Sequence, residues 1–224
     1  MSTLIDVIIR VTQKGPLKYF VHWPLLAILI IKQKIDSHYY DLMSDAEKRE
    51  VIVRWGQSCG CEIVVESGTF MGWTAEYVSK YFSRYITIEL DPIFYRNAVD
   101  KFKDTKNVEV ILGNSGDVLF GLMGKLDQRA LFYLDGHYCG HNTAKGDSNT
   151  PIIQEIITIL SHADKNHVIL IDDARMFLGC DGYPSIRELR KLVNRIAKGY
   201  ELRVSDDIIK IYNPACHDHA RRWR

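Results

Sequence analysis

Acidic side chains stand directly after two short apolar runs of this 224-residue sequence. Asp135 follows LFYL, and the pair Asp172–Asp173 follows VILI. If the runs are neighbouring parallel strands, their carboxyl ends lie about 5 Å apart, so the three carboxylates converge. Their mutual repulsion would be relieved by a divalent cation, and oxygen ligands favour Mg²⁺, Mn²⁺ or Ca²⁺.

A base stands close to these acids. A cation would lower the pKa of a bound hydroxyl group, and a nearby base would take its proton. His137 is the candidate base because an imidazole titrates at a pH of about 6.5, and His141 is a second candidate. Two other interpretations stay open: Arg175 pairs with the carboxylates in place of a metal, or Asp173 is only solvated.

A glycine-containing turn follows another apolar run, in the segment ESGTFMGWT at 66–74. Gly68 and Gly72 permit a tight bend and a close approach of ligand to backbone. Phe70 stands at the middle position and departs from the dinucleotide pattern G-x-G-x-x-G. Glu89 comes 23 residues after the first residue of this segment, close to the spacing at which a carboxylate accepts hydrogen bonds from a ribose diol.

Alternating patterns indicate the elements that hold these residues. Apolar runs alternate with amphipathic segments, which is typical of βαβ units around a parallel sheet. Ser44 and Glu47 form a capping-box pattern before a helix at 45–57. The predicted strands are EIVVE (62–66), YITIE (85–89), VEVIL (108–112), LFYLD (131–135) and VILID (168–172), with ELRV (201–204) and IIKIY (208–212) as a closing antiparallel pair.

The predicted fold is therefore α/β, a Rossmann-like doubly wound, mostly parallel sheet with a C-terminal antiparallel strand pair. In such sheets, ligands bind outside the carboxyl ends of the strands, near the switch in strand order. Small and polar residues after the third strand, in GNSGD at 113–117, would then meet the edge of an adenine.

In that order, ESGTFMGWT, YITIELD, VILGNSGD, LFYLDGH and HVILIDD resemble class I S-adenosylmethionine (SAM)-dependent methyltransferases. More narrowly, they are similar to the metal-dependent catechol and caffeoyl-CoA type and to the macrocin and aminocoumarin sugar O-methyltransferases. The pattern E-x-G-x-[FY]-x-G-[WY]-[ST] is fairly specific for that group, and the likeness spans about residues 60–175. The resemblance implies SAM as cofactor, bound by Glu66, Gly68, Thr69, Phe70, Gly72, Thr74, Glu89, Leu90, Asn114, Ser115 and Asp135.

The resemblance also assigns roles within that set. Glu66 and Gly68 line the methionine end of SAM, and Thr74 hydrogen-bonds its carboxylate or amine. Glu89 holds the ribose, and Ser115 lies at the adenine.

The same likeness implies Asp135, Asp172 and Asp173 as ligands of a divalent cation, with Asp135 and His137 as catalytic residues. His137 matches the D-G-D or D-G-H position of the sugar methyltransferases. Tyr138 replaces the lysine of catechol-type relatives, which argues against catechols as acceptors.

Residues 1–44 match no motif and are expected to be an apolar N-terminal extension, before a methyltransferase domain at 45–224. Within it, YFVHWPLLAILII at 19–31 is too short for a bilayer span, which needs about 20 residues. It is expected to cover the sheet, to form a homodimer interface or to make a peripheral membrane contact.

Bulk composition narrows the partners. The net charge is +1, so no overall field favours nucleic acid, and none is expected as a partner. Five cysteines, an odd number, indicate no disulfide framework and a cytoplasmic setting, with a possible membrane association through residues 19–31.

The sequence thus predicts a SAM-dependent O-methyltransferase that acts on a hydroxyl of a sugar or another polar small molecule with a divalent cation, which the resemblance implies to be Mg²⁺. Polar loops at 141–150 and 177–184 are expected to flank the acceptor. The alternatives are a metal-independent class I methyltransferase, a catalytically inactive SAM- or nucleotide-binding partner protein, and an RNA methyltransferase.

Overall fold

The computed structural model describes residues 43–136, 151–180 and 182–216. The chain divides into two units after Asp41, and the described residues belong to the second unit. The expectations for residues 1–44 and for the segment at 19–31 therefore lie almost wholly outside the described residues. His137, His141 and the loop at 141–150 also lie outside them.

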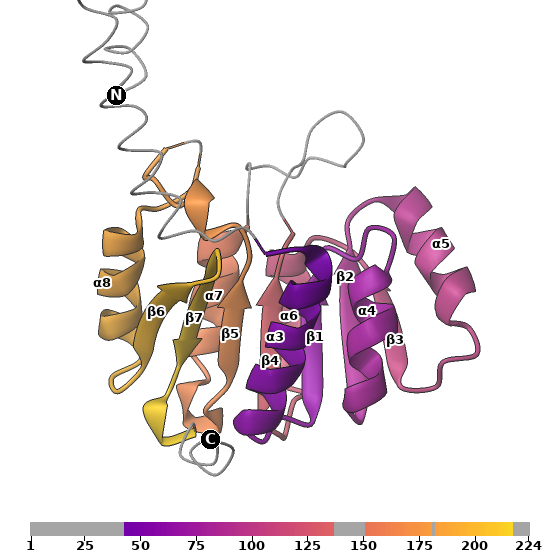
Figure 1. Ribbon diagram of the computed structural model, residues 1–224, viewed down its shortest axis with the longest axis horizontal. Helices are drawn as coiled ribbons and strands as arrows, with labels where there is room; N and C mark the ends of the chain where they lie inside the picture. The colour runs from indigo at the N-terminus through magenta and orange to yellow at the C-terminus, as the bar shows by residue number, and fades with distance from the viewer. Residues whose placement is uncertain (1–42, 137–150, 181, 217–224) are drawn as a thin grey trace, which may run out of the picture. The chain divides into compact units, whose positions relative to one another are not determined.

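The described part of the chain forms one seven-stranded sheet in the order β3-β2-β1-β4-β5-β7-β6 (Figure 1). The first five strands pair in parallel, and β7 runs antiparallel to both β5 and β6. This confirms the predicted fold class. The strands are β1 (Ile63–Ser67), β2 (Arg84–Glu89), β3 (Val108–Leu112), β4 (Ala130–Leu134), β5 (Val168–Ile171), β6 (Glu201–Ser205) and β7 (Ile208–Tyr212).

Helices cover both faces of the sheet (Figure 1). Helices α3 and α4 pack side by side on one face, α5 packs against β2 and β3, and α6 packs against α7, which contacts α8. Their bounds are α3 (Asp45–Ser58), α4 (Trp73–Val78), α5 (Pro92–Phe102), α6 (Ser115–Met123), α7 (Ile152–Leu160) and α8 (Ile186–Ile196), with 3₁₀ turns η2 (Ser79–Tyr81), η3 (Ala163–Lys165) and η4 (Ala174–Met176).

Burial explains why the central strands read as continuous apolar runs. Every residue of β1, β4, β5 and β7 is buried, whereas the edge strand β3 is partly exposed. A strand covered by helices on both faces has no solvent face to fill with polar side chains. Most polar residues of these strands therefore stand at or after the strand ends, although Lys210 is buried in the middle of β7.

The switch in strand order falls at β1, which lies between β2 and β4. Successive strands are added in opposite directions from β1, since β2 and β3 lie on one side of it and β4 and β5 on the other. The crevice between the loops after β1 and β4 is thus the expected ligand site of this sheet.

The start of α3 is fixed by the predicted capping box. The Ser44 hydroxyl accepts from the Glu47 N–H, and the Glu47 carboxylate accepts from the Ser44 N–H at 2.8 Å. Since α3 leads into β1, its first turn lies at the carboxyl edge of the sheet. The capping-box pattern in the sequence therefore predicted the start of α3, whose first turn lies at the ligand edge of the sheet.

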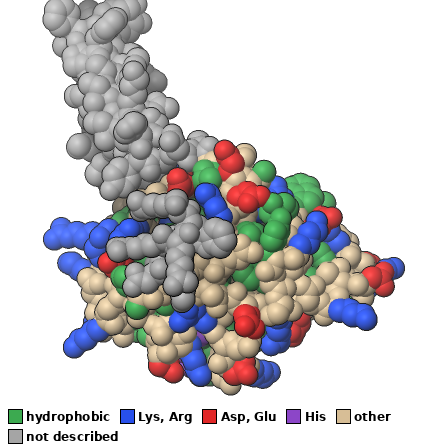
Figure 2. All heavy atoms as spheres, turned by 60° about the horizontal axis from the view of Figure 1, so that its bottom comes forward, with side chains coloured by type: hydrophobic (Ala, Val, Ile, Leu, Met, Phe, Trp, Pro, Cys, Tyr) green, Lys and Arg blue, Asp and Glu red, His purple; other side chains and the backbone are tan. Residues whose placement is uncertain are grey.

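Charged residues of both signs share the surface (Figure 2), and three of the described cysteines are buried. Lysine and arginine are interspersed with aspartate and glutamate over the face shown in Figure 2. None of the helices in the described ranges is long and apolar enough to cross a membrane. Cys59, Cys61 and Cys216 are buried thiols, and burial raises the pKa of Cys59 to about 11.

Candidate active site

The turn between β1 and α4 uses three left-handed backbone positions. Gly68, Phe70 and Gly72 have φ angles of 91°, 47° and 69°. Gly68 is required for a second reason, because a Cβ there would lie 2.8 Å from the Asp135 carbonyl oxygen. Phe70 is the costly member, since a bulky side chain disfavours positive φ.

Glu89, at the end of β2, holds this turn in place. One carboxylate oxygen accepts from the Phe70 N–H at 2.8 Å, and the other accepts from the Asp91 N–H at 2.8 Å. The side chain is buried, with 8% of the residue exposed. Each oxygen keeps a further acceptor position, so the carboxylate is oriented by the backbone and can still receive hydrogen bonds from a diol.

Glu66 lies beneath the turn in a buried chain of hydroxyls. The Thr87 hydroxyl donates to Glu66 Oε2 at 2.7 Å. Because that uses its single proton, Thr69 donates to Thr87, over 2.6 Å. Burial raises the pKa of Glu66 to about 8, against the lowering effect of Thr87 and with a further raising contribution from Asp135.

This buried acid predicts a pH-dependent stability. The folded-state pKa of Glu66 exceeds its ordinary value of 4.5. Its contribution to the free energy of unfolding is thus fully present below pH 4.5, declines as the pH rises and is lost above about pH 8. In the ligand-free Glu66→Gln protein, the free energy of unfolding should fall by a few kcal/mol less than in the wild type between about pH 5 and 8.5. Thermal melts across this pH range measure the difference. Unchanged slopes would contradict the buried neutral carboxyl.

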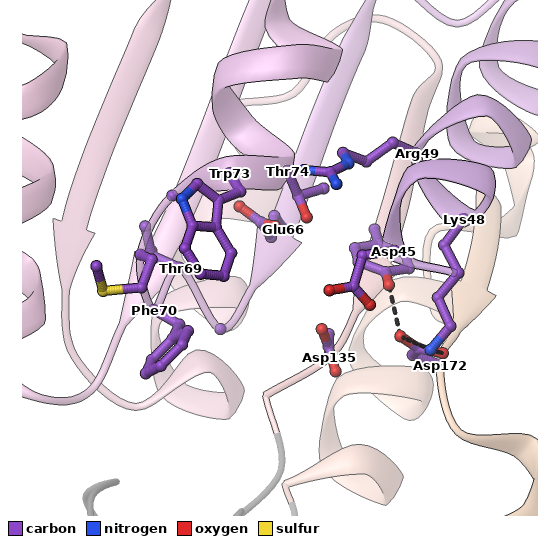
Figure 3. A pocket seen from close by; sticks show the side chains of 14 residues that line it. Asp45, Lys48, Arg49, Glu66, Thr69, Phe70, Trp73, Thr74, Asp135 and Asp172 are labelled. Atoms are coloured by element: carbon purple, nitrogen blue, oxygen red, sulfur yellow. Dashed lines mark hydrogen bonds and ion pairs between the residues drawn. The ribbon is translucent and has the colours of Figure 1, made fainter. Parts of the chain in front are cut away.

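A pocket opens at this edge of the sheet (Figure 3). Its wall comes from the first turn of α3, the β1–α4 turn and the ends of β4 and β5. In Figure 3, Phe70 and Trp73 lie on the side opposite Lys48 and Asp172, and Arg49 lies beside Thr74. The lining residues are Asp45, Lys48, Arg49, Glu66, Gly68, Thr69, Phe70, Met71, Gly72, Trp73, Thr74, Tyr133, Asp135 and Asp172.

Asp172 is a heavily bonded acid of the pocket. Lys48 Nζ lies 2.7 Å from Oδ1 and 2.9 Å from Oδ2. The Tyr133 hydroxyl donates to Oδ2 at 2.7 Å, and the Asp173 N–H donates to Oδ1 at 2.7 Å. A carboxylate has about four acceptor positions, and these contacts use all of them.

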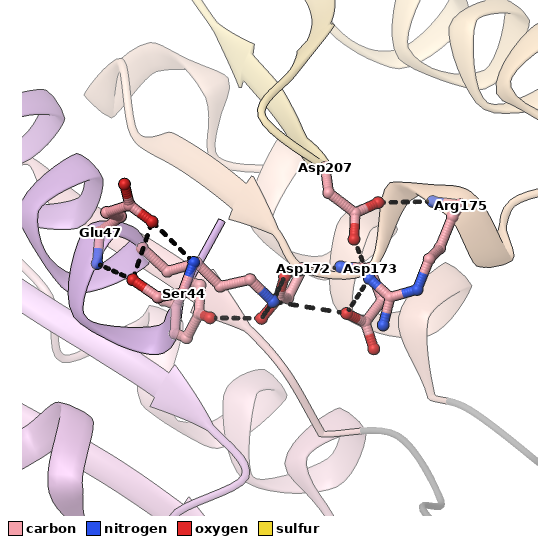
Figure 4. A network of polar contacts seen from close by, with 8 residues as sticks. Ser44, Glu47, Asp172, Asp173, Arg175 and Asp207 are labelled. Atoms are coloured by element: carbon pink, nitrogen blue, oxygen red, sulfur yellow. Dashed lines mark hydrogen bonds and ion pairs between the residues drawn. The ribbon is translucent and has the colours of Figure 1, made fainter. Parts of the chain in front are cut away.

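The ion pairs continue away from the pocket (Figure 4). Lys48 Nζ lies 3.5 Å from Asp173 Oδ1, and Arg175 Nη1 lies 2.8 Å from the same oxygen. Arg175 also pairs with Asp207, which is fully buried in the β6–β7 turn. Burial lowers the pKa of Lys48, but Asp172, Asp173 and Asp135 outweigh this effect and the net pKa is raised. Lys48 is therefore a cation at neutral pH.

The expected set of metal ligands differs from the set that the structure brings together. Among the described residues, the carboxylates of Asp172, Asp173 and Asp207 offer oxygens within 4.8 Å of one another. Asp135 lies in the same pocket as Asp172 but is not in that group. With Lys48 and Arg175 bound to these acids, the donor set does not fit a divalent cation in this arrangement. The alternative in which Arg175 pairs with the carboxylates matches the observed contacts.

Most residues expected at the cofactor line the pocket or brace it. Glu66, Gly68, Thr69, Phe70, Gly72, Thr74 and Asp135 line it, and Glu89 supports its turn. Asn114 instead caps α6, where its side chain accepts from the Gly116 N–H at 2.9 Å. Ser115 is buried at the start of α6, and Leu90 is 36% exposed beyond the pocket wall. Their contact with an adenine stays a prediction.

Besides Met71 and Trp73 of the β1–α4 region, sequence reasoning missed four residues of the pocket lining and one of the acidic cluster: Asp45, Lys48, Arg49, Tyr133 and Asp207. Three of them were recognisable, because positions i, i+3 and i+4 share one face of a helix, and the capping box had already placed that helix. Tyr133 was hidden inside an apolar strand. Asp207 was hidden in a hairpin turn, since nothing in the sequence gives the order of β5, β7 and β6.

Comparison with solved structures identifies the fold class. The O-methyltransferase TomG from Streptomyces achromogenes, solved with SAM, superposes with a TM-score of 0.55, at 16% identity, over 77% of this chain and 82% of that one. An O-methyltransferase from Bacillus cereus, solved with S-adenosylhomocysteine (SAH), gives a TM-score of 0.52 at 12% identity over 82% and 88%. The chain therefore has the fold of class I SAM-dependent methyltransferases.

Sequence comparison adds one curated relative. A probable ribosomal RNA small subunit methyltransferase A from Methanosarcina barkeri is 30% identical over 104 residues, which cover 46% of this chain. The match spans only 36% of that protein's length. No family model matches the chain.

Proposed function

We propose that this protein is a SAM-dependent O-methyltransferase that acts on a hydroxyl of a polar small molecule such as a sugar. The observation that carries the proposal is the link between the β1–α4 turn and Glu89. A backbone N–H of the turn donates to the Glu89 carboxylate at the end of β2, next to β1, where the strand order switches. Two methyltransferases with this fold were solved with SAM or SAH, and this supports the choice of cofactor.

The pocket suits the charges of SAM. The cofactor would supply a methyl group on a positively charged sulfur, together with an ammonium and a carboxylate. Asp45 and Asp135 offer negative charge to the cationic groups. Arg49, next to Thr74, suits the carboxylate (Figure 3). The exposed Phe70 and Trp73 rings border this end of the pocket and would limit the access of water.

Transfer to oxygen also needs removal of the hydroxyl proton. His137 comes two residues after Asp135 in the sequence. It remains the proposed base on the acceptor side. Asp135 would orient the acceptor or the base through its carboxylate. Of the two forms expected from the sequence, with and without a divalent cation, the proposal takes the form without one. The cation itself stays a prediction of the sequence.

Methyl transfer from radiolabelled SAM to a panel of acceptors tests the proposal. The panel should contain sugars and glycosides, a catechol, and small ribosomal subunit RNA, with and without Mg²⁺ and after dialysis against EDTA. We expect label in the sugar or glycoside fraction. Label in RNA alone would favour the activity named for the Methanosarcina relative. SAM binding without transfer to any acceptor would favour a catalytically inactive binding partner.

A further inference from the structure

We propose that Lys48 is the resident cation of the acidic cluster formed by Asp172, Asp173 and Asp207, and that it takes the place of a divalent ion. The charge balance of the site would then come from the chain itself. Removing the ammonium group should convert the cluster into a divalent-cation site. This proposal goes beyond the proposed methyl transfer, and it can be tested by metal binding without turnover.

The acceptor positions of Asp172 are already occupied. Lys48 contacts both of its oxygens, and the Tyr133 hydroxyl and the Asp173 N–H occupy the remaining acceptor positions. A metal ion needs a lone pair directed at it, at about 2.0–2.6 Å for Mg²⁺ or Ca²⁺. In this arrangement such an ion could bind Asp172 only by displacing Lys48 or breaking one of the other bonds.

Lys48 is held beside Asp172 in a mostly buried position. The side chain is only 13% exposed, and it reaches Asp172 from the first turn of α3, 124 residues away in the chain. A long-range, mostly buried pair of this kind holds its geometry better than an exposed one, for which salt screening and side-chain freedom remove most of the gain. The capping box fixes the helix end from which Lys48 extends.

The acidic cluster contains more carboxylates than cationic side chains. Among the described residues, three carboxylates meet two cationic side chains, Lys48 and Arg175. Without Lys48, this described cluster would carry a net charge of −2, which a divalent cation would neutralise. Asp172 and Asp173 would then each have an oxygen facing the vacated position.

Binding of Mn²⁺, measured by electron paramagnetic resonance and by calorimetry, tests this inference. The dissociation constant of the wild-type protein for Mn²⁺ should be about millimolar or higher, as for a weak surface site. Lys48→Met keeps the length and packing of the side chain but removes its charge, and it should bind one Mn²⁺ at least tenfold more tightly. Adding Asp172→Asn to Lys48→Met should abolish the gain.

Arg84→Met is the matched control, because it removes the cationic partner of Glu109 from an exposed ion pair outside the site. It should leave Mn²⁺ binding unchanged. Stoichiometric, micromolar Mn²⁺ binding by the wild-type protein that Asp172→Asn removes would overturn the inference. So would a folded Lys48→Met protein, judged by circular dichroism, with no gain in affinity. The wild-type measurement decides even if Lys48→Met fails to fold.

Discussion

Replacing His137 with alanine is expected to lower kcat by at least about 100-fold while the affinity for SAM changes little. Proton removal by a placed base typically contributes about 10²–10⁴-fold to the rate. Methyl transfer needs the acceptor oxygen opposite the departing sulfur, so the base must approach from the acceptor side. His137 follows the last described residue after β4 and is the first strongly basic residue in the sequence beyond Asp135.

The pH profile separates catalysis from structure. If an imidazole must lose its proton before turnover, a plot of kcat against pH should show an acidic limb, and His137→Ala should remove it. His141→Ala is the matched control, because it removes the second candidate imidazole, four residues further along the sequence. Near-normal turnover of His137→Ala, or a parallel loss of SAM binding, would make His137 structural and pass the role of base to His141.

Replacing Glu89 with alanine is expected to weaken SAM binding by about 1.5–3 kcal/mol, the scale of hydrogen bonds to a charged group. That corresponds to an increase in Kd of about 10- to 150-fold. The structure gives a second reason for a loss, since the change would leave the Phe70 and Asp91 N–H groups without their acceptor. Phe70 would then lose the bond that holds its left-handed backbone.

Calorimetric titration with SAH measures this effect. Glu109→Ala provides the control, because Glu109 is an exposed glutamate on the neighbouring strand β3. Thermal melts without ligand report whether the turn itself has collapsed. A Kd for Glu89→Ala within twofold of the wild-type value would remove Glu89 from the cofactor site.

The sheet could be predicted from the sequence because local patterns determine it. Five apolar runs separated by amphipathic segments leave few alternatives to a parallel sheet, and strands buried on both faces carry that signal most clearly. The observed bounds differ by one residue at several ends. Asp135, for example, follows β4 instead of ending it.

The cofactor turn was also accessible, because its glycines and the acid after β2 have fixed spacings along the chain. Phe70 shows where that reasoning ends. Its positive φ is accompanied by a hydrogen bond that its own N–H donates to Glu89 on another strand. A spacing rule allows such a conformation only at glycine.

The acidic cluster could be predicted only in part, because its members come from distant elements. Asp172 and Asp173 follow one strand and were found together. Lys48 and Asp207 reach them from α3 and from the β6–β7 turn, and only the three-dimensional arrangement makes them neighbours. The sequence shows Asp172 and Asp173 together but does not show that Lys48 lies beside them, and acids without a nearby cation suggest a metal site. The metal prediction and the observed ion pairs therefore differ at this cluster.

A crystal structure of the protein with SAH, grown in the presence of Mg²⁺, tests the central claim most directly. We predict SAH along the carboxyl edge of the sheet, with its methionine end between Glu66 and Thr74 and its ribose hydroxyls on Glu89. We also predict that Lys48 stays on Asp172, with no metal between them. SAH bound elsewhere, or absent from this pocket at millimolar concentration, would contradict the proposed cofactor site.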